Sequence, residues 1–253
     1  MPIFIDINYP IYTVIIENPE VKNAVDGETA RELADAFRQF ERDNKALVAV
    51  LWGSNGNFCS GANLKAILEG RGNRIERDGD GPMGPTRMLL KKPVIAAVAG
   101  YAVAGGLELA IWCDLRVVEE SAVFGVFCRR FGVPLIDGGT VRLPRLIGMS
   151  RALDMILTGR AVTAQEAYQW GLANRLVEDG KSRQKAEELA KELSKFPQIC
   201  MHNDRFSIYA QFGLKVEDAM KREFEFGLKT LESGEYLKGS EDFTFGKGKH
   251  GKF

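Results

Sequence analysis

The chain has 253 residues, of which 45% are hydrophobic and 27% charged, an ordinary composition for a globular protein. Basic and acidic residues number 34 each, so nothing indicates a general attraction to nucleic acid or acidic membranes. The four cysteines show neither metal-ligand spacing nor the density of a disulfide scaffold. No apolar run has the length of a membrane span, and the first ten residues do not resemble a secretion signal. We expect a cytoplasmic protein with no nucleic-acid or membrane partner.

The N-terminal segments alternate between strand and helix patterns. Ile3–Ile7 and Ile11–Ile16 flank Asn8-Tyr9-Pro10, which predicts two strands joined by a turn. Apolar residues at helical spacing predict an amphipathic helix from about Ala30 to Arg42. The continuous apolar run Leu47–Trp52 then predicts a buried strand.

Two glycine-containing segments follow. Phe58–Asn63 predicts a short strand and a turn into a helix that begins at about Leu64. Gly70–Pro85 contains five glycines, two prolines and six charged residues, which predicts a mobile loop beside a functional site.

The stretch Pro93–Asp114 is the most informative part of the chain. Val94–Ala99 has the length and β-branched content of a strand buried on both faces, and Leu107–Trp112 reads as a buried helix. The glycine pair Gly105-Gly106 allows backbone N–H groups to approach a ligand at a helix N-terminus. Glu108 lies inside the apolar helix, where a carboxyl group needs a specific partner. This combination suits chemistry on an oxyanion.

Beyond the central stretch, strand patterns end well before the chain does. Leu115–Val118, Ala122–Phe124 and Ala173–Val177 predict short strands, whereas helical patterns dominate from Pro197 to about Leu231. We therefore expect a β/α core over residues 1–195 and a helical segment over residues 196–253.

Two motifs in the order and spacing seen here resemble the enoyl-CoA hydratase (crotonase) family. They are Cys59–Lys65 (CSGANLK) and Gly100–Ala110 (GYAVAGGLELA), the second followed by Cys113-Asp114. Further matching segments spread the resemblance over nearly the whole chain: Asn23-Ala24, Leu157–Arg160, Ala167–Val177 and Gly246–Gly251.

The resemblance implies an α/β fold, a crotonase (ClpP-like) spiral of repeated ββα units. It also implies that the C-terminal helices form a homotrimer or a dimer of trimers, and that the substrate is an acyl-CoA thioester. We expect no metal and no separate cofactor, because CoA is part of the substrate.

The same resemblance implies which residues bind the thioester oxygen and which contact the CoA moiety. The backbone N–H groups of Ala62 and Gly105 would bind the thioester oxygen, and two such donors stabilise an enolate. CoA would contact the positions listed here: Lys22, Ala24, Ala62, Asn63, Leu64, Lys65 and Gly105. For Lys22 and Lys65 the alternative is a solvated surface charge.

Glu108 matches the first of two catalytic glutamates in the hydratases, and its alternative is a structural hydrogen-bond partner. The position of the second glutamate is Cys128. That cysteine is either a small buried residue or a reactive thiol activated by Arg129 and Arg130. Asp137 is the other candidate for the missing acid, and its alternative is a helix N-cap before Gly138-Gly139. We predict that Glu108 and Asp137, rather than Cys128, form the acid/base pair.

These observations favour an enoyl-CoA hydratase that adds water to, or removes it from, a CoA thioester. The enzymatic alternatives are double-bond isomerisation, C–C cleavage, thioester hydrolysis and dehalogenation. A CoA-binding or RNA-associated scaffold without catalysis is the alternative from another class, although Glu108 and the neutral charge argue against it. Nucleotide-binding glycine motifs are absent, and His202 and His250 lie far from the glycine motifs in sequence.

Overall fold

The computed structural model describes residues 2–248, which divide into two compact units between Lys191 and Glu192. This division lies close to residue 195, where the sequence changes from strand-and-helix patterns to helical patterns alone.

The first unit contains a large sheet and a small one among its described residues. The large sheet has the strand order β1-β2-β3-β4-β6-β9 and the small one the order β5-β7-β8. The strands are β1 (Ile3–Asn8), β2 (Ile11–Ile16), β3 (Val48–Gly53), β4 (Val94–Val98), β5 (Tyr101–Val103), β6 (Leu115–Glu119), β7 (Val123–Gly125), β8 (Val162–Thr163) and β9 (Arg175–Val177).

Strand direction follows from the connections. β1 and β2 form the predicted antiparallel pair, and all other neighbours in the large sheet are parallel. Every residue of β4 is buried, as expected for a central parallel strand with both faces covered. The carboxyl ends of β3, β4 and β6 therefore meet at one edge of the sheet, where open α/β sheets bind ligands.

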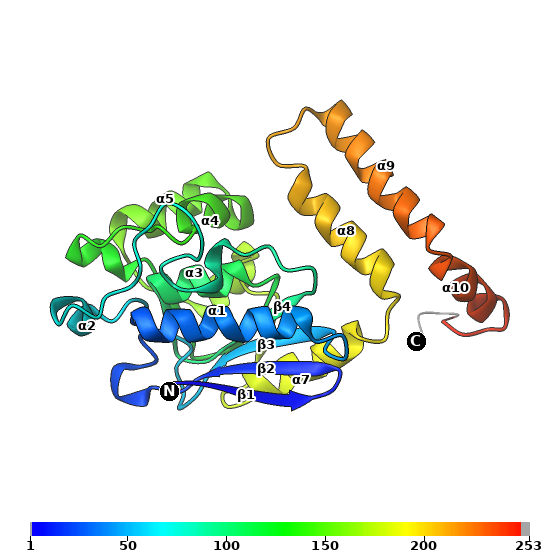
Figure 1. Ribbon diagram of the computed structural model, residues 1–253. Helices are drawn as coiled ribbons and strands as arrows, with labels where there is room; N and C mark the ends of the chain where they lie inside the picture. Colours follow the sequence, from blue (N-terminus) through cyan, green and yellow to red (C-terminus); the bar gives the residue numbers. More distant parts are fainter. Residues whose placement is uncertain (1, 249–253) are drawn as a thin grey trace. The chain divides into compact units, whose positions relative to one another are not determined.

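In the first unit, helices fill the connections between strands, and one more helix follows β9 (Figure 1). They are α1 (Gly27–Arg42), α2 (Leu64–Leu68), α3 (Gly105–Trp112), α4 (Gly139–Ile147), α5 (Met149–Thr158), α6 (Ala164–Trp170) and α7 (Ser182–Leu193), with short 3-10 turns η1 (Pro19–Val21), η2 (Pro85–Arg87) and η3 (Phe127–Phe131). A capping box between Thr163 and Glu166 opens α6. Leu33, Phe37 and Phe40 on α1 are fully buried against the sheet.

The expected repetition of ββα units is confirmed. β4, β5 and α3 form one repeat, and β6, β7 and α4 form the next, with one strand of each repeat in each sheet. The predicted strand at Phe58-Cys59 is reduced to a single bridge between Cys59 and Ala102, because the chain turns at Gly61 with φ of +97°.

The second unit consists of helices α8 (Gln198–Ala210), α9 (Val216–Glu232) and α10 (Glu235–Thr244). Helices α8 and α9 pack side by side (Figure 1). The rings of Phe206 and Phe226 stack with centroids 6.4 Å apart. The helices thus continue beyond Leu231, where the sequence pattern predicts their end. His250 and the end of the Gly246–Gly251 motif lie outside the described residues.

None of the helices described over residues 2–248 combines the length and apolar character needed to cross a membrane.

Candidate active site

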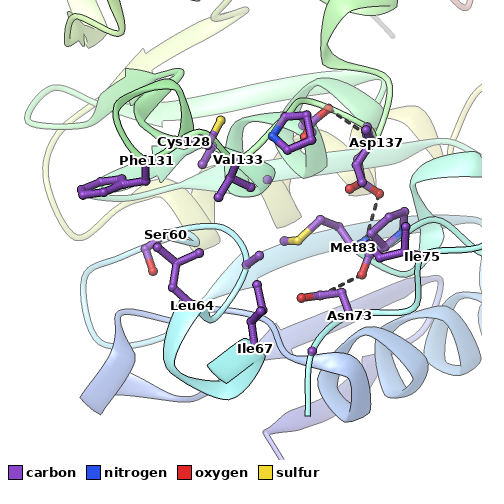
Figure 2. Close-up of a pocket in the computed structure, with 18 of the residues that line it drawn as sticks. Ser60, Leu64, Ile67, Asn73, Ile75, Met83, Cys128, Phe131, Val133 and Asp137 are labelled. Atoms are coloured by element: carbon purple, nitrogen blue, oxygen red, sulfur yellow. Dashed lines mark hydrogen bonds between the residues drawn. The ribbon is translucent and has the colours of Figure 1, made fainter. Parts of the chain in front are cut away.

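A pocket of about 440 Å³ lies between segments that follow three of the strands (Figure 2). Its walls come from the segments after β3, after β5 and after β7, together with the loop that contains Asn73 and Met83. The apolar lining residues are Leu64, Ile67, Ile75, Pro82, Met83, Phe127, Phe131, Val133, Pro134 and Ile136. The polar ones are Ser60, Asn73, Glu108, Cys128 and Asp137.

The backbone of Ala62 is held so that its N–H group stays available. Ala62 forms a parallel bridge with Val25, in which the Val25 N–H donates to Gly61 O (2.8 Å) and the Asn63 N–H donates to Val25 O (2.9 Å). In this pattern the N–H of Ala62 itself points to the opposite side. It donates to no acceptor among the residues described, and Ala62 lines the pocket.

Gly105 offers a second donor because it is the first residue of α3, whose leading N–H groups have no partner within the helix. The preceding Ala104 has φ +53° and ψ −126°, a strained backbone for a residue with a side chain. Its N–H donates to Gly125 O (2.8 Å), which fixes the turn. The dipole of α3 also favours negative charge at this end.

The two donors belong to segments in direct contact. A Cβ atom at Gly61 would lie 3.0 Å from the Gly105 nitrogen and 2.9 Å from the Ala104 Cβ. Two N–H groups with no acceptor among the described residues therefore belong to adjoining turns that line one pocket, and such a pair can stabilise an oxyanion.

Glu108 lies in the first turn of α3 and is only 2% exposed. Its Oε1 accepts hydrogen bonds from the N–H groups of Asp137 (2.9 Å) and Gly139 (2.8 Å). No hydrogen bond is described for Oε2, and the side chain lines the pocket. Burial raises the pKa of Glu108 to about 7, although the Gly139 N–H opposes the shift. A carboxyl group with this pKa can both donate and accept a proton near neutral pH.

Asp137 lies on the segment before α4 and is 4% exposed. The N-cap interpretation is wrong, because the N-cap is Gly138 with φ +95° and no side-chain cap. The Asp137 Oδ1 instead accepts hydrogen bonds from the Met83 N–H (2.9 Å) and the Thr86 hydroxyl. Burial raises the pKa of Asp137, with the Thr86 and Met83 hydrogen bonds acting in the opposite direction. Asp137 lines the same pocket as Glu108.

Cys128 is 8% exposed and also lines the pocket. Burial, and then the charge of Glu108, raise the pKa of its thiol, so the thiol is neutral at pH 7. The charge of Arg129 lowers the pKa of this thiol, but burial and Glu108 outweigh it. The guanidinium groups of Arg129 and Arg130 donate instead to the carbonyl oxygens of Ile156 and Gly159. Cys128 therefore has the properties of a small neutral wall residue.

A model of the enoyl-CoA hydratase/isomerase family matches residues 6–244. The chain belongs to this family. The fold of solved family members agrees: the enoyl-CoA hydratase from Mycobacterium tuberculosis H37Rv superposes with a TM-score of 0.91 at 32% identity, covering 96% of this chain and 95% of that one. The enoyl-CoA hydratase from Mycobacterium marinum gives a TM-score of 0.90 at 30% identity, with the same coverage. The resemblance and crotonase fold expected from the sequence are thus confirmed.

Other relatives with similar sequences are named carnitinyl-CoA dehydratase, not enoyl-CoA hydratase. A protein called carnitinyl-CoA dehydratase from Proteus mirabilis is 33% identical over 213 residues, which cover 83% of this chain and 81% of that protein. A carnitinyl-CoA dehydratase from Salmonella typhi is 38% identical over 188 residues, covering 74% and 72%. The chain is therefore a crotonase-family acyl-CoA enzyme.

The residues expected at CoA lie on two adjoining segments. The Ser60 N–H donates to Lys22 O (3.1 Å), which brings Lys22–Val25 beside Ser60–Asn63. Asn63 caps α2 through its side chain, which accepts from the Ala66 N–H (3.2 Å). Lys22 and Lys65 are exposed, and the Lys22 ammonium lies 4.6 Å from the centre of the Tyr101 ring. Their role toward CoA remains a prediction.

Sequence reasoning missed three residues that touch Asp137: Met83, Thr86 and Arg142. The Arg142 guanidinium donates to the carbonyl oxygens of Asp137 (2.8 Å) and Thr86 (2.7 Å). Met83 and Thr86 lie more than fifty positions before Asp137, in a segment without periodicity, so no sequence signal joins them to it.

Proposed function

We propose that this crotonase-family enzyme catalyses the addition of water to a 2-enoyl-CoA thioester, and the reverse dehydration. The observation that carries the proposal is the Glu108 carboxyl group, with a pKa of about 7, in the pocket that the free N–H groups of Ala62 and Gly105 also face. Water addition forms an enolate, so it needs an oxyanion site and a proton for the α-carbon in the same place.

In the proposed reaction, one of the two carboxyl groups carries a proton and the other is ionised. For hydration, the proton is on Glu108. The ionised Asp137 removes a proton from water as the water oxygen bonds to the β-carbon, and the double-bond electrons move onto the thioester oxygen. Glu108 then protonates the α-carbon. Dehydration starts from the same single-proton state with the proton on the other carboxyl group, so both directions depend on pH in the same way.

Cys128 takes no part in this proposed proton transfer, because its neutral thiol is a poor base at pH 7. We expect Cys128→Ser to keep turnover within about threefold of the wild type. Loss of turnover in Cys128→Ser together with a silent Asp137→Asn would reverse the assignment of the partner group.

The acyl group is proposed to be uncharged and apolar. No lysine, arginine or histidine is among the described residues that line the pocket. Ile75 and Phe131 line it yet are 69% and 70% exposed, so an apolar acyl tail that covers them gains free energy. A carnitinyl group carries a quaternary ammonium, which binds best between aromatic rings, but the Phe127 ring is already covered by Arg130 at 4.1 Å.

The test is a hydration assay with 2-enoyl-CoA thioesters of increasing chain length, alongside dehydration of carnitinyl-CoA. We expect kcat/KM to rise by up to about fourfold for each added methylene until the pocket is filled. Carnitinyl-CoA should react at least roughly tenfold more slowly than the best apolar substrate. Hydration of none of the 2-enoyl thioesters would refute the proposed reaction. If the protein converted only 3-enoyl-CoA, added to the same assay, it would be a double-bond isomerase.

The CoA moiety is proposed to lie along Lys22–Ala24 and Ala62–Lys65. Lysine ammonium groups at Lys22 and Lys65 would neutralise its phosphates. A trimer or a dimer of trimers, a cytoplasmic location and the absence of any further cofactor stay predictions.

A further inference from the structure

Asp137 is connected to a turn that no motif in the sequence points to. Its Oδ1 accepts from the Thr86 hydroxyl and from the Met83 N–H at 2.9 Å, and both donors are buried. No hydrogen bond is described for Oδ2. Figure 2 shows a carboxylate oxygen of Asp137 bonded to the Met83 backbone in the pocket wall.

The turn that carries the two donors is tightly built. The N–H groups of Gly81 and Gly84 each donate to the other residue's carbonyl oxygen, at 3.0 and 2.8 Å. A Cβ atom at Gly81 would lie 2.0 Å from the Thr86 Oγ1 and 2.7 Å from the Asp137 Oδ1. Only glycine at position 81 leaves room for the hydrogen bond between Thr86 and Asp137.

Arg142 adds a second connection between the same two segments. Its guanidinium donates to the backbone oxygens of Asp137 (2.8 Å) and Thr86 (2.7 Å). The charged and titratable groups that act on Asp137 are Glu108 from α3, Arg87 from η2 and Arg142 itself from α4. The Asp137 N–H donates to Glu108, so the same residue touches both the turn and the carboxyl group on α3.

We propose that Thr86 is a positioning residue, whose hydroxyl fixes the Asp137 carboxylate so that Oδ2 stays directed at the reacting water opposite Glu108. This inference rests on the proposed hydration. Without the Thr86 hydroxyl, only the Met83 N–H holds Oδ1. The carboxylate then turns more freely about its last bond, and Oδ2 spends less time in the position that proton transfer requires. Thr86 also stabilises the ionised form of Asp137, because it donates to the carboxylate.

The experiment compares Thr86→Val, which preserves shape and removes the hydroxyl, with Thr86→Ser, which restores it. We expect Thr86→Val to lower kcat by roughly tenfold or more with little change in KM, and Thr86→Ser to recover most of the loss. The acid limb of the pH–rate profile should move upward by about one pH unit in Thr86→Val, since the pKa of Asp137 rises without its donor.

Thr13→Val is the matched control. Thr13 is a buried threonine on β2 whose hydroxyl donates to the Glu187 carboxylate (2.9 Å), away from the pocket. It should lower stability without moving the pH profile.

A titration of the Asp137 carboxyl carbon by NMR, assigned with Asp137→Asn, needs no activity. An inactive wild type would refute the proposed hydration, and the titration would still show whether Thr86 holds Asp137. An active wild type with the same acid limb and the same Asp137 titration in Thr86→Val would overturn the role of Thr86.

Discussion

At the scale of single residues, the raised pKa of Glu108 lowers the stability of the folded protein at neutral pH, and it allows the carboxyl group to transfer a proton there. Its pKa is raised from 4.5 to about 7, so the folded protein binds a proton more tightly than the unfolded chain between these pH values. Stability from this group is therefore full below about pH 4.5 and is lost as the pH rises through about 7. Glu108→Gln mimics the protonated form and should become more stable relative to the wild type between pH 5 and pH 8, by up to about 3 kcal/mol in urea unfolding.

The same substitution should abolish turnover. Glu108→Gln keeps the hydrogen bonds to Asp137 and Gly139 but cannot transfer a proton, so kcat should fall by at least about a hundredfold with KM nearly unchanged. In the wild type, kcat/KM should decrease about tenfold per pH unit above pH 7, where both carboxyl groups are ionised. An active Glu108→Gln protein, or a flat profile from pH 6 to pH 9, would contradict a proton-transfer role and favour a CoA-binding protein.

At the scale of elements, the start of α4 fixes the position of the carboxyl group on α3. The Gly139 N–H donates to Glu108, and a Cβ atom at Gly139 would lie 2.8 Å from the Glu108 Oε1 and 3.1 Å from its Cγ. Gly139→Ala should therefore displace the carboxyl group, lower kcat by roughly tenfold or more, and cost about 1–3 kcal/mol of stability. Steady-state kinetics and urea unfolding measure the two effects.

Gly239→Ala, in a different helix, is the control for Gly139→Ala. Gly239 lies in α10 with no atom within 4 Å of an added Cβ, so alanine should stabilise the helix by about 0.5–1 kcal/mol and leave kcat unchanged. Equal kinetics for Gly139→Ala and Gly239→Ala would show that α4 does not fix Glu108.

At the scale of the whole molecule, the second unit exposes an apolar stripe that predicts self-association. Val216, Met220, Phe224 and Leu228 repeat every four residues on α9 and are 39–71% exposed. Surfaces of this kind are covered by another subunit in stable proteins. We expect light scattering at micromolar concentration to give three or six times the mass of one chain. Phe224→Asp should dissociate the assembly, whereas Glu223→Ala should not, and a monomeric wild type would contradict the prediction.

The sequence by itself determined the family, the helical C-terminal segment and the most telling residues of the site. Local patterns were sufficient there, because a glycine turn at a helix start and a carboxyl group in an apolar helix are encoded within a few neighbouring residues. The motifs around Ala62, Gly105 and Glu108 are of this kind, and the structure brings all three to one pocket.

Only the tertiary structure decided what surrounds Asp137 and Cys128. Whether Asp137 caps α4 or lines the pocket depends on Thr86 and Met83, which lie 51 and 54 positions away in the chain. Whether Cys128 is a reactive thiol depends on the direction of Arg129 and Arg130, which bind carbonyl oxygens near residues 156–159 instead. The pKa and hydrogen bonding of a side chain follow from burial and from contacts made across the fold, so local sequence patterns cannot contain them.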